Sequence, residues 1–256
     1  MTDTYGGLVP AVKPVLPPMS NEELVWPVSY INKVLHRDCI TAMKGIPDKA
    51  VDLVLTDPPY LNANMAYDTF KDSSDVTKLV LQFLEEARRI SKIVIFPSGK
   101  YETELELFRI APPRWRLCWF KGASSNISPV GFNDWEMMMV YGDKICVNQH
   151  DHFHIRNDEK MGNYGHPCPK PLGWARWIIE KFCPEKGIVL DPFVGSGTVV
   201  QAAKELNRSY IGMDISWNYC EKARERAQNA LPNIVVDKDA RKQQIGRKTL
   251  KKGYLV

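Results

Sequence analysis

The last third of the chain alternates between two hydrophobic periods, and this alternation constrains the fold more than any other feature. "GIVLDPF" and "SYIGMDIS" are short apolar runs typical of strands, whereas "PLGWARWIIEKFC", "GTVVQAAKELN" and "WNYCEKARERAQNAL" have helical spacing. Strands that alternate with helices form parallel βαβ units, because each helix covers one face of the sheet. We therefore expect an α/β fold: an open, mostly parallel sheet with helices on both faces.

The first half of the chain continues the same pattern. Residues 51–55, "VDLVL", form a nearly continuous apolar run, which predicts a strand buried on both faces. A helix is expected over 75–90, followed by a strand in "KIVIFPSG". "RWRLCWFKG" and "WEMMMVYGD" predict two further strands on either side of a loop over 122–133.

The chain of 256 residues is long enough for one well-buried domain, and composition suggests where it begins and ends. Residues 1–28 are rich in Pro and Gly and predict an extended N-terminal arm. Residues 29–235 are expected to form the folded domain, with an insertion at about 144–165, where no period is visible. The basic tail over 236–256 is either a solvated terminus or an arm that grips phosphate.

Charge and cysteine usage exclude few functions. The net charge of +4 permits a polyanionic partner without requiring one. The six cysteines are scattered, which fits neither a zinc ribbon nor a disulfide scaffold. The sequence shows no signal peptide and no apolar run long enough for a bilayer, so we expect a cytoplasmic protein with no membrane contact.

Two strand ends carry residues that a buried strand does not need. "VDLVL" runs into "TDPPY", and "IVL" runs into "DPFVGSG". In a doubly wound sheet, ligands bind outside the carboxyl ends of the strands. Gly195 and Gly197 allow a tight turn before a helix, but Val200 stands where a dinucleotide loop has its third glycine. Asp214 ends the next strand, where an acid commonly accepts ribose hydroxyls or caps a helix, so we expect a nucleoside-bearing cofactor without pyrophosphate.

These motifs, in this order, resemble the β group of S-adenosylmethionine-dependent DNA amino-methyltransferases. "DPPY" is similar to the tetrad that holds the target base, and "FVGSG" to the turn that holds the cofactor. "HPCPKP" and "HRDC" are similar to two further segments that line the cofactor pocket. The resemblance implies a circularly permuted, Rossmann-like class I methyltransferase domain, in which the 144–165 insertion recognises the target. It implies these catalytic residues: Asp57, Pro58, Pro59 and Tyr60. It implies these cofactor-binding residues: Asp38, Cys39, His166, Lys170, Asp191, Phe193, Gly195, Ser196, Gly197, Thr198 and Asp214.

The residue types of the tetrad suit methylation of a base amine. The lone pair of such an amine is conjugated into the ring, so the nitrogen is a poor nucleophile until its hydrogens are held out of the ring plane. The Asp57 carboxylate and the Pro58 carbonyl can each accept one N–H. Tyr60 offers an aromatic face to a base that has left the duplex stack. The cofactor is already activated, so no metal is expected.

Several residues outside these motifs are candidates for contact with DNA. "HDHFH" would place three imidazoles on one face of a strand, which is conceivable as a metal site, but we favour contacts with phosphate or bases. The candidate DNA-binding residues are Lys121, Ser124, Asn126, His152, His154, Arg156 and Lys160.

The expected function is site-specific methylation of double-stranded DNA at N6 of adenine, because Asp in the first tetrad position goes mainly with adenine in this family. The alternatives are an N4-cytosine DNA methyltransferase, an RNA or protein N-methyltransferase, and a catalytically silent nucleic-acid-binding module. The intact Asp57, Tyr60, Gly195 and Gly197 argue against the silent module. The sequence leaves open the recognition site, whether the protein is a homodimer and whether a restriction endonuclease accompanies it.

Overall fold

The computed structural model describes residues 18–19, 22–59, 73–99, 101–122, 127–128, 131–142, 150–156 and 169–232. The described strands are β1 (Lys33–His36), β2 (Val51–Leu55), β3 (Ser91–Pro97), β4 (Trp115–Phe120), β5 (Ile127–Ser128), β6 (Gly131–Phe132), β7 (Trp135–Gly142), β8 (His152–His154), β9 (Ile188–Asp191) and β10 (Ser209–Asp214). The described helices are α1 (Cys39–Met43), α2 (Ser73–Ile90), α3 (Tyr101–Ile110), α4 (Leu172–Phe182), α5 (Thr198–Glu205) and α6 (Trp217–Asn229).

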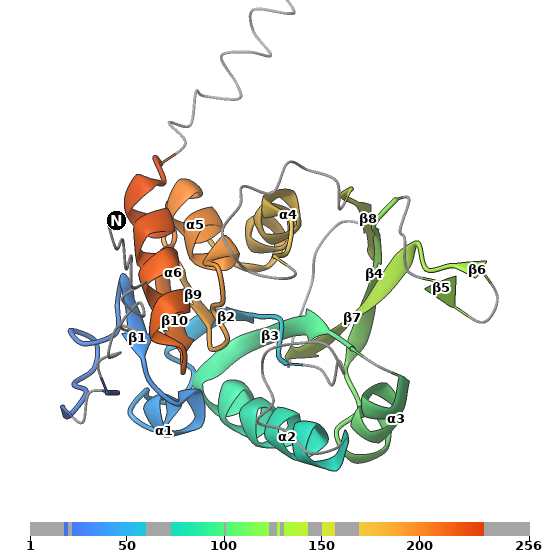
Figure 1. Ribbon diagram of the computed structural model, residues 1–256, viewed down its shortest axis with the longest axis horizontal. Helices are drawn as coiled ribbons and strands as arrows, with labels where there is room; N and C mark the ends of the chain where they lie inside the picture. Colours follow the sequence, from blue (N-terminus) through green and yellow to red (C-terminus); the bar gives the residue numbers. More distant parts are fainter. Residues whose placement is uncertain are drawn as a thin grey trace, which may run out of the picture.

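The main sheet has the strand order β1-β10-β9-β2-β3-β7-β4-β8 (Figure 1). Strand β7 is antiparallel to both of its neighbours, β3 and β4, and the other pairs are parallel. The short strands β5 and β6 pair with each other, away from the main sheet. The prediction of a mostly parallel open sheet is confirmed.

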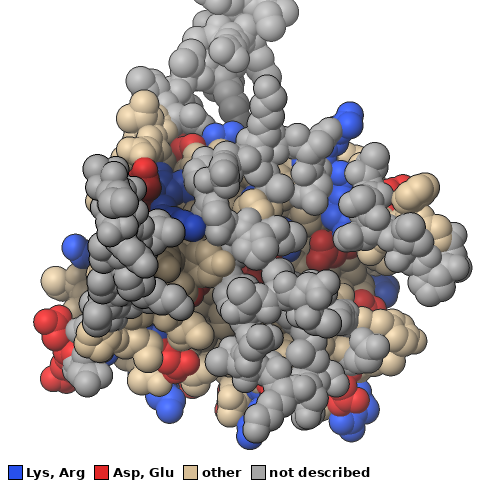
Figure 2. Space-filling view, in the orientation of Figure 1, with Lys and Arg blue, Asp and Glu red and all other residues tan. Residues whose placement is uncertain are grey.

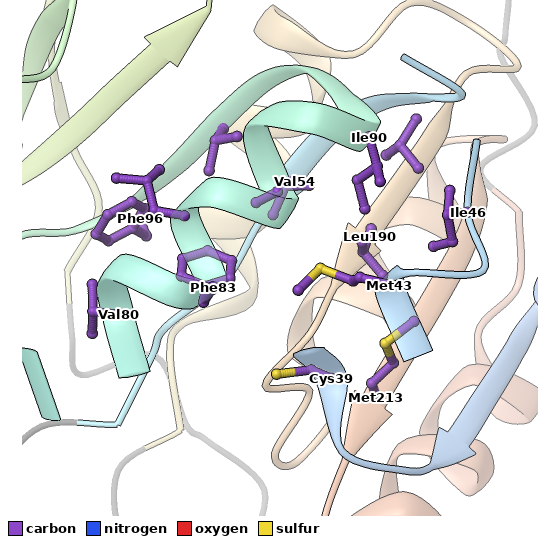
Figure 3. Packing of buried hydrophobic residues seen from close by; sticks show 14 of the residues in the cluster. Cys39, Met43, Ile46, Val54, Val80, Phe83, Ile90, Phe96, Leu190 and Met213 are labelled. Carbon is purple, nitrogen blue, oxygen red and sulfur yellow. The ribbon is translucent and has the colours of Figure 1, made fainter. Parts of the chain in front are cut away.

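Helices cover both faces of this sheet, as the sequence predicted. On one face, α1 and α2 contribute Met43, Phe83 and Ile90 to a cluster with Val54 of β2 (Figure 3). On the other face, α4 and α5 pack against β2 and β9 in a second cluster, and α6 lies beside α5. No helix within the described residues has both the length and the apolar composition of a membrane span.

The apolar sequence of strand β2 follows from its position in the middle of the sheet. Val51, Leu53, Val54 and Leu55 are fully buried, because helices cover both faces of the strand. Burial of each such side chain contributes about 1.5–3 kcal/mol of transfer free energy. An alternating polar pattern would have left polar groups in one of the two clusters, so a continuous apolar run is required here.

Three local features differ from the expectations. Helix α3 was not anticipated, because only Thr103 and Leu107 of its described side chains are buried and no clear apolar stripe results. Strand β8, inside the predicted 144–165 insertion, adds to the edge of the main sheet beside β4 and buries only Phe153. In the predicted N-terminal arm, Leu24 and Trp26 pack against the core rather than standing apart from it.

A buried polar contact joins the two central strands at their carboxyl ends. Leu53 and Val54 of β2 lie opposite Val189 and Leu190 of β9 in parallel register, so both strands end at the same level. Just beyond, Thr56 Oγ1 donates to Asp191 Oδ1 over 2.6 Å.

Asp191 is buried, and this burial raises the pKa of its carboxyl to about 7. Hydrogen bonds from Thr56 and from the Phe193 amide oppose the rise, and the charges of Asp57 and Asp214 add to it.

We predict that Asp191 makes stability fall as pH rises. A carboxyl with a pKa of 3.8 when unfolded and about 7 when folded holds its proton more tightly in the folded state. Its contribution to stability is therefore fully present below pH 3.8 and is lost as pH rises through about 7. Asp191→Asn should flatten the pH dependence of the free energy of unfolding across this window.

Urea unfolding, followed by tryptophan fluorescence at a series of pH values, measures this effect. Asp48→Asn is the matched control, because Asp48 is an exposed aspartate whose side chain is 76% accessible. Profiles of wild type and Asp191→Asn that run parallel between pH 3.8 and about 7 would contradict the prediction.

A second prediction concerns Gly212 of β10. A Cβ at this position would lie 2.9 Å from Cγ2 of Val194 and 3.2 Å from Cγ1 of Val200. Gly212→Ala should therefore lower the free energy of unfolding by about 1–3 kcal/mol, which denaturant unfolding measures. Val194→Ala, which removes the nearest methyl group, should partly compensate, so the double variant should lose less than the sum of the single variants. Strictly additive losses would show that this contact is not the cause.

Candidate active site

The two unusual loops of the sequence lie side by side where the chain reverses its winding. From β2 the chain proceeds to its neighbour β3, and from β9 it proceeds to β10 on the opposite side. The crevice outside the carboxyl ends of β2 and β9 is thus the topological switch point, where ligands bind in folds of this kind. The DPPY loop follows β2, and the glycine turn follows β9.

Asp57, the first residue of the tetrad, has its two carboxylate oxygens in different surroundings. Lys170 Nζ donates to Oδ2 over 2.5 Å. Oδ1 is buried and has no hydrogen-bond partner among the residues that the structure describes. Pro58 is buried, Pro59 is half-buried, and Tyr60 lies outside the described residues. One oxygen of the carboxylate therefore has acceptor capacity that no described residue uses.

Lys170 was expected to line the cofactor pocket, and its side chain instead points to Asp57. Its main-chain carbonyl accepts a hydrogen bond of 3.1 Å from Thr198 Oγ1, at the start of α5. His166, from the same "HPCPKP" segment, lies outside the described residues. Sequence reasoning missed the pairing because 113 residues separate the lysine from its partner.

The glycine turn has the backbone that its sequence predicts. Gly195 and Gly197 have φ angles of 47° and 87°, in the left-handed region that favours glycine. The close approach at Gly197, however, is to a helix: a Cβ there would lie 2.7 Å from Cα of Ala223 in α6. Substitution of Gly197 would therefore disturb helix packing as well as any binding.

Ser196 and Thr198 of this turn are tied to α6 by an arginine that the sequence analysis did not single out. Arg226 Nη1 donates to Ser196 Oγ over 3.2 Å and to Thr198 Oγ1 over 3.0 Å. Its Nε donates to Gln201 in α5. In "CEKARERAQ" this residue resembles the exposed charges around it, but it is only 9% exposed. A buried arginine with several acceptors stiffens the turn.

Asp214 also braces the turn from the end of β10. Its Oδ2 accepts from the Gly195 amide over 3.0 Å, and its Oδ1 accepts from the Ser216 amide over 2.8 Å. Burial raises the pKa of this carboxyl, and the two hydrogen bonds and His36 oppose the rise. The Ile215 amide also bonds to this carboxylate, so about one of its lone-pair sites is left to accept a hydroxyl.

The structure gives the remaining described cofactor candidates contacts within the protein. Asp38 follows β1 and caps α1, because its Oδ1 accepts from the Thr41 amide over 2.8 Å. Cys39 is buried, which raises the pKa of its thiol to about 12 and excludes a reactive thiolate. Phe193 packs edge-to-face on Phe83 of α2, with ring centroids 5.4 Å apart.

The predicted DNA-binding residues fall into three groups. Lys121 is buried with its Nζ 3.6 Å from Glu136, so its ammonium is not available on the surface as we had expected. His152, His154 and Arg156 are exposed at the β8 edge of the sheet, where Phe120 stacks on the ring of His154 at 4.6 Å. The other candidates, Ser124, Asn126 and Lys160, lie outside the described residues.

Neither a metal site nor a concentration of one charge distinguishes the β8 edge within the described residues. In the part of the chain that the structure describes, no group of three His, Cys, Asp or Glu side chains is arranged to hold a metal ion. On the face drawn in Figure 2, the described basic and acidic side chains are interspersed.

The sequence matches known DNA methyltransferases over most of its length. The N6/N4 methyltransferase family model, described as DNA methylase, matches residues 115–225. The type II methyltransferase M.HpaI of Haemophilus parainfluenzae is 29% identical over 235 residues, covering 76% of this chain and 73% of its own. The putative methylase YubD of Escherichia coli strain K12 is 28% identical over 207 residues, covering 77% and 90%.

Solved structures agree on the fold. The PvuII DNA methyltransferase, which is cytosine-N4-specific, has a TM-score of 0.59 at 17% identity and covers 86% of this chain and 93% of its own. The complex of M1.HpyAVI with SAM has a TM-score of 0.57 at 19% identity, with 76% and 98% covered. These neighbours share the class I methyltransferase fold. The family model, the sequence relatives and the solved structures thus all make this chain similar to DNA amino-methyltransferases.

Proposed function

We propose that the protein transfers a methyl group from S-adenosyl-L-methionine to N6 of an adenine that has left the stack of double-stranded DNA. One observation carries the proposal: the buried Oδ1 of Asp57 lacks a partner in the described part of the chain, beside the glycine turn at the switch point. A buried carboxylate oxygen without a donor is costly, and an exocyclic amine supplies the missing N–H.

The residues around the turn fit a nucleoside-bearing methyl donor. Gly195, with its left-handed backbone, and the amides at the start of α5 place main-chain groups beside the crevice. The Asp214 carboxylate has acceptor capacity left for a ribose hydroxyl. A pyrophosphate site would require a third glycine or a lysine in the turn, and the turn contains neither. When bound, S-adenosyl-L-methionine supplies a methyl group already activated on a sulfonium.

The chain then has to orient the amine. Asp57 Oδ1 accepts one amine N–H and the Pro58 carbonyl accepts the other, which concentrates the nitrogen lone pair on the side of the methyl group. The bound donor would supply its methyl group with cleavage of the S–C bond, the electron pair would stay on sulfur, and the proton lost from the nitrogen would pass to water. Positioning accounts for most of the rate, because the donor needs no further activation.

Adenine is our choice because of the Asp at the head of the tetrad, which this family associates mainly with adenine. N4 of cytosine is the second candidate, favoured by the likeness to the cytosine-N4-specific PvuII enzyme. Incubation of the protein with labelled donor and unmethylated genomic DNA, followed by mass spectrometry of the nucleosides, separates the two. N6-methyladenine supports the proposal, N4-methylcytosine supports the second candidate, and unmodified DNA overturns both.

Replacing the tetrad acid should slow turnover with little effect on donor binding. Asp57→Ala removes the acceptor used mainly in the transition state, so kcat should fall on the order of a hundredfold or more while donor affinity stays within a few fold. Methylation kinetics and calorimetry measure the two quantities. Asp48 precedes the amino end of β2, at the opposite end of the strand from the tetrad, so Asp48→Ala should leave kcat and donor affinity unchanged. Wild-type turnover in Asp57→Ala would remove the tetrad from the mechanism.

We propose that recognition is confined to a short target. Within residues 144–165 the structure describes one three-residue strand and the exposed Arg156 beyond it. Each base contact needs its own side chain in a groove, so a segment this short should read roughly four to six base pairs or have loose specificity. Phosphate contacts should supply much of the affinity and make it fall with added salt. Single-molecule sequencing of modified DNA reveals the target, and a strict site of about eight or more base pairs would locate recognition elsewhere.

The domain limits stay as proposed from the sequence, with a methyltransferase domain over 29–235 and terminal segments over 1–28 and 236–256. The contacts of Leu24 and Trp26 suggest that the end of the first segment belongs to the domain.

A further inference from the structure

The side chain of Lys170 stands at a position where an unpaired charge would be costly. It is only 13% exposed, and its ammonium reaches the Asp57 carboxylate, itself 25% exposed, over 2.5 Å. A lysine at this depth requires a partner, and a hydrogen-bonded ion pair shielded from water is stronger than a surface pair.

The main chain of Lys170 is held by the opposite loop. Its carbonyl accepts from Thr198 Oγ1 over 3.1 Å, and that oxygen accepts from the buried Arg226 over 3.0 Å. Pro171 follows with a φ of −60° and caps α4. The lysine thus extends from a fixed backbone, with one end on the glycine turn and the other on the tetrad.

This anchoring gives the two oxygens of Asp57 separate tasks. A carboxylate rotates readily about its terminal bond, and either oxygen can then face a ligand. With Oδ2 bonded to Lys170, that rotation is restricted, and Oδ1 is the oxygen left without a donor among the described residues.

We propose that Lys170 is a positioning residue: it holds Oδ2 of Asp57 so that Oδ1 faces the amine of the target base. The proposal rests on the methyl transfer proposed above and adds to it a role for a residue that the sequence assigned to the cofactor pocket. Lys170 touches neither reacting atom and acts through the orientation of the carboxylate.

The test compares Lys170→Met, which fills the same space without a donor, with Lys170→Arg, which restores one. In Lys170→Met the single-turnover rate should fall about tenfold or more, because misplacement of an orienting group is costly, while donor affinity stays within a few fold. Lys170→Arg should recover most of the rate. Lys92→Met is the matched control: Lys92 pairs with Asp52 over 2.6 Å, away from the crevice, and its loss should not change the rate.

A double-variant cycle separates positioning from general destabilisation. In an Asp57→Ala background, Lys170→Met should have almost no further effect, since there is no carboxylate to orient. Multiplicative losses would overturn the proposal, as would a wild-type rate in Lys170→Met.

Crystal structures of the variants supply a readout that does not depend on activity. In Lys170→Met the Asp57 carboxylate should be turned from its wild-type orientation, and in Lys170→Arg it should keep it. An unchanged carboxylate in Lys170→Met overturns this inference alone. If wild-type protein modifies no DNA, the proposed function fails, and the structures still decide whether Lys170 orients Asp57.

Discussion

The hydrogen bond from Thr56 to Asp191 lies at the point on which the rest of the site depends. It joins the carboxyl ends of β2 and β9, the two strands after which the chain proceeds to opposite sides of the sheet. Burial makes this contact matter, because an unpaired carboxyl at this depth would be costly. The tetrad follows β2 and the glycine turn follows β9, so the relative position of these two loops depends on the alignment of the two strand ends.

Much of the fold could be predicted because each central strand and helix has a strong local period. The apolar run Val51–Leu55 required helices on both faces of the strand. The alternation of strands and helices later in the chain was compatible with few sheet topologies. Helix α3 was missed because it buries few side chains, and the place of β8 in the main sheet was missed because only Phe153 of this strand is buried. Their place is set by packing against α2 and β4, which local sequence does not contain.

The sequence motifs named residues for the candidate site, but they did not give the contacts of those residues. The motifs identified Asp57, Lys170 and the glycine turn, yet the lysine proved to hold the acid, and Gly197 proved to make room for Ala223. The sequence analysis did not single out Arg226, and it named Lys121 as a candidate for contact with DNA, whereas both side chains are buried. Such errors share a cause: residue type gives the chemistry available, whereas partners distant in sequence decide where it is used.

The contact between Thr56 and Asp191 spans 135 residues, and this has a consequence for synthesis of the protein. On the ribosome, β3 emerges soon after β2, but β9, its other neighbour, appears only when three quarters of the chain has been made. Until then β2 is an edge strand, with unpaired amides and carbonyls and an almost wholly apolar sequence. Such an edge can pair with other chains. Pro58 and Pro59, which follow Thr56 and Asp57 after the strand, end that edge, so residues of the tetrad also limit how far a wrong partner could extend the ladder.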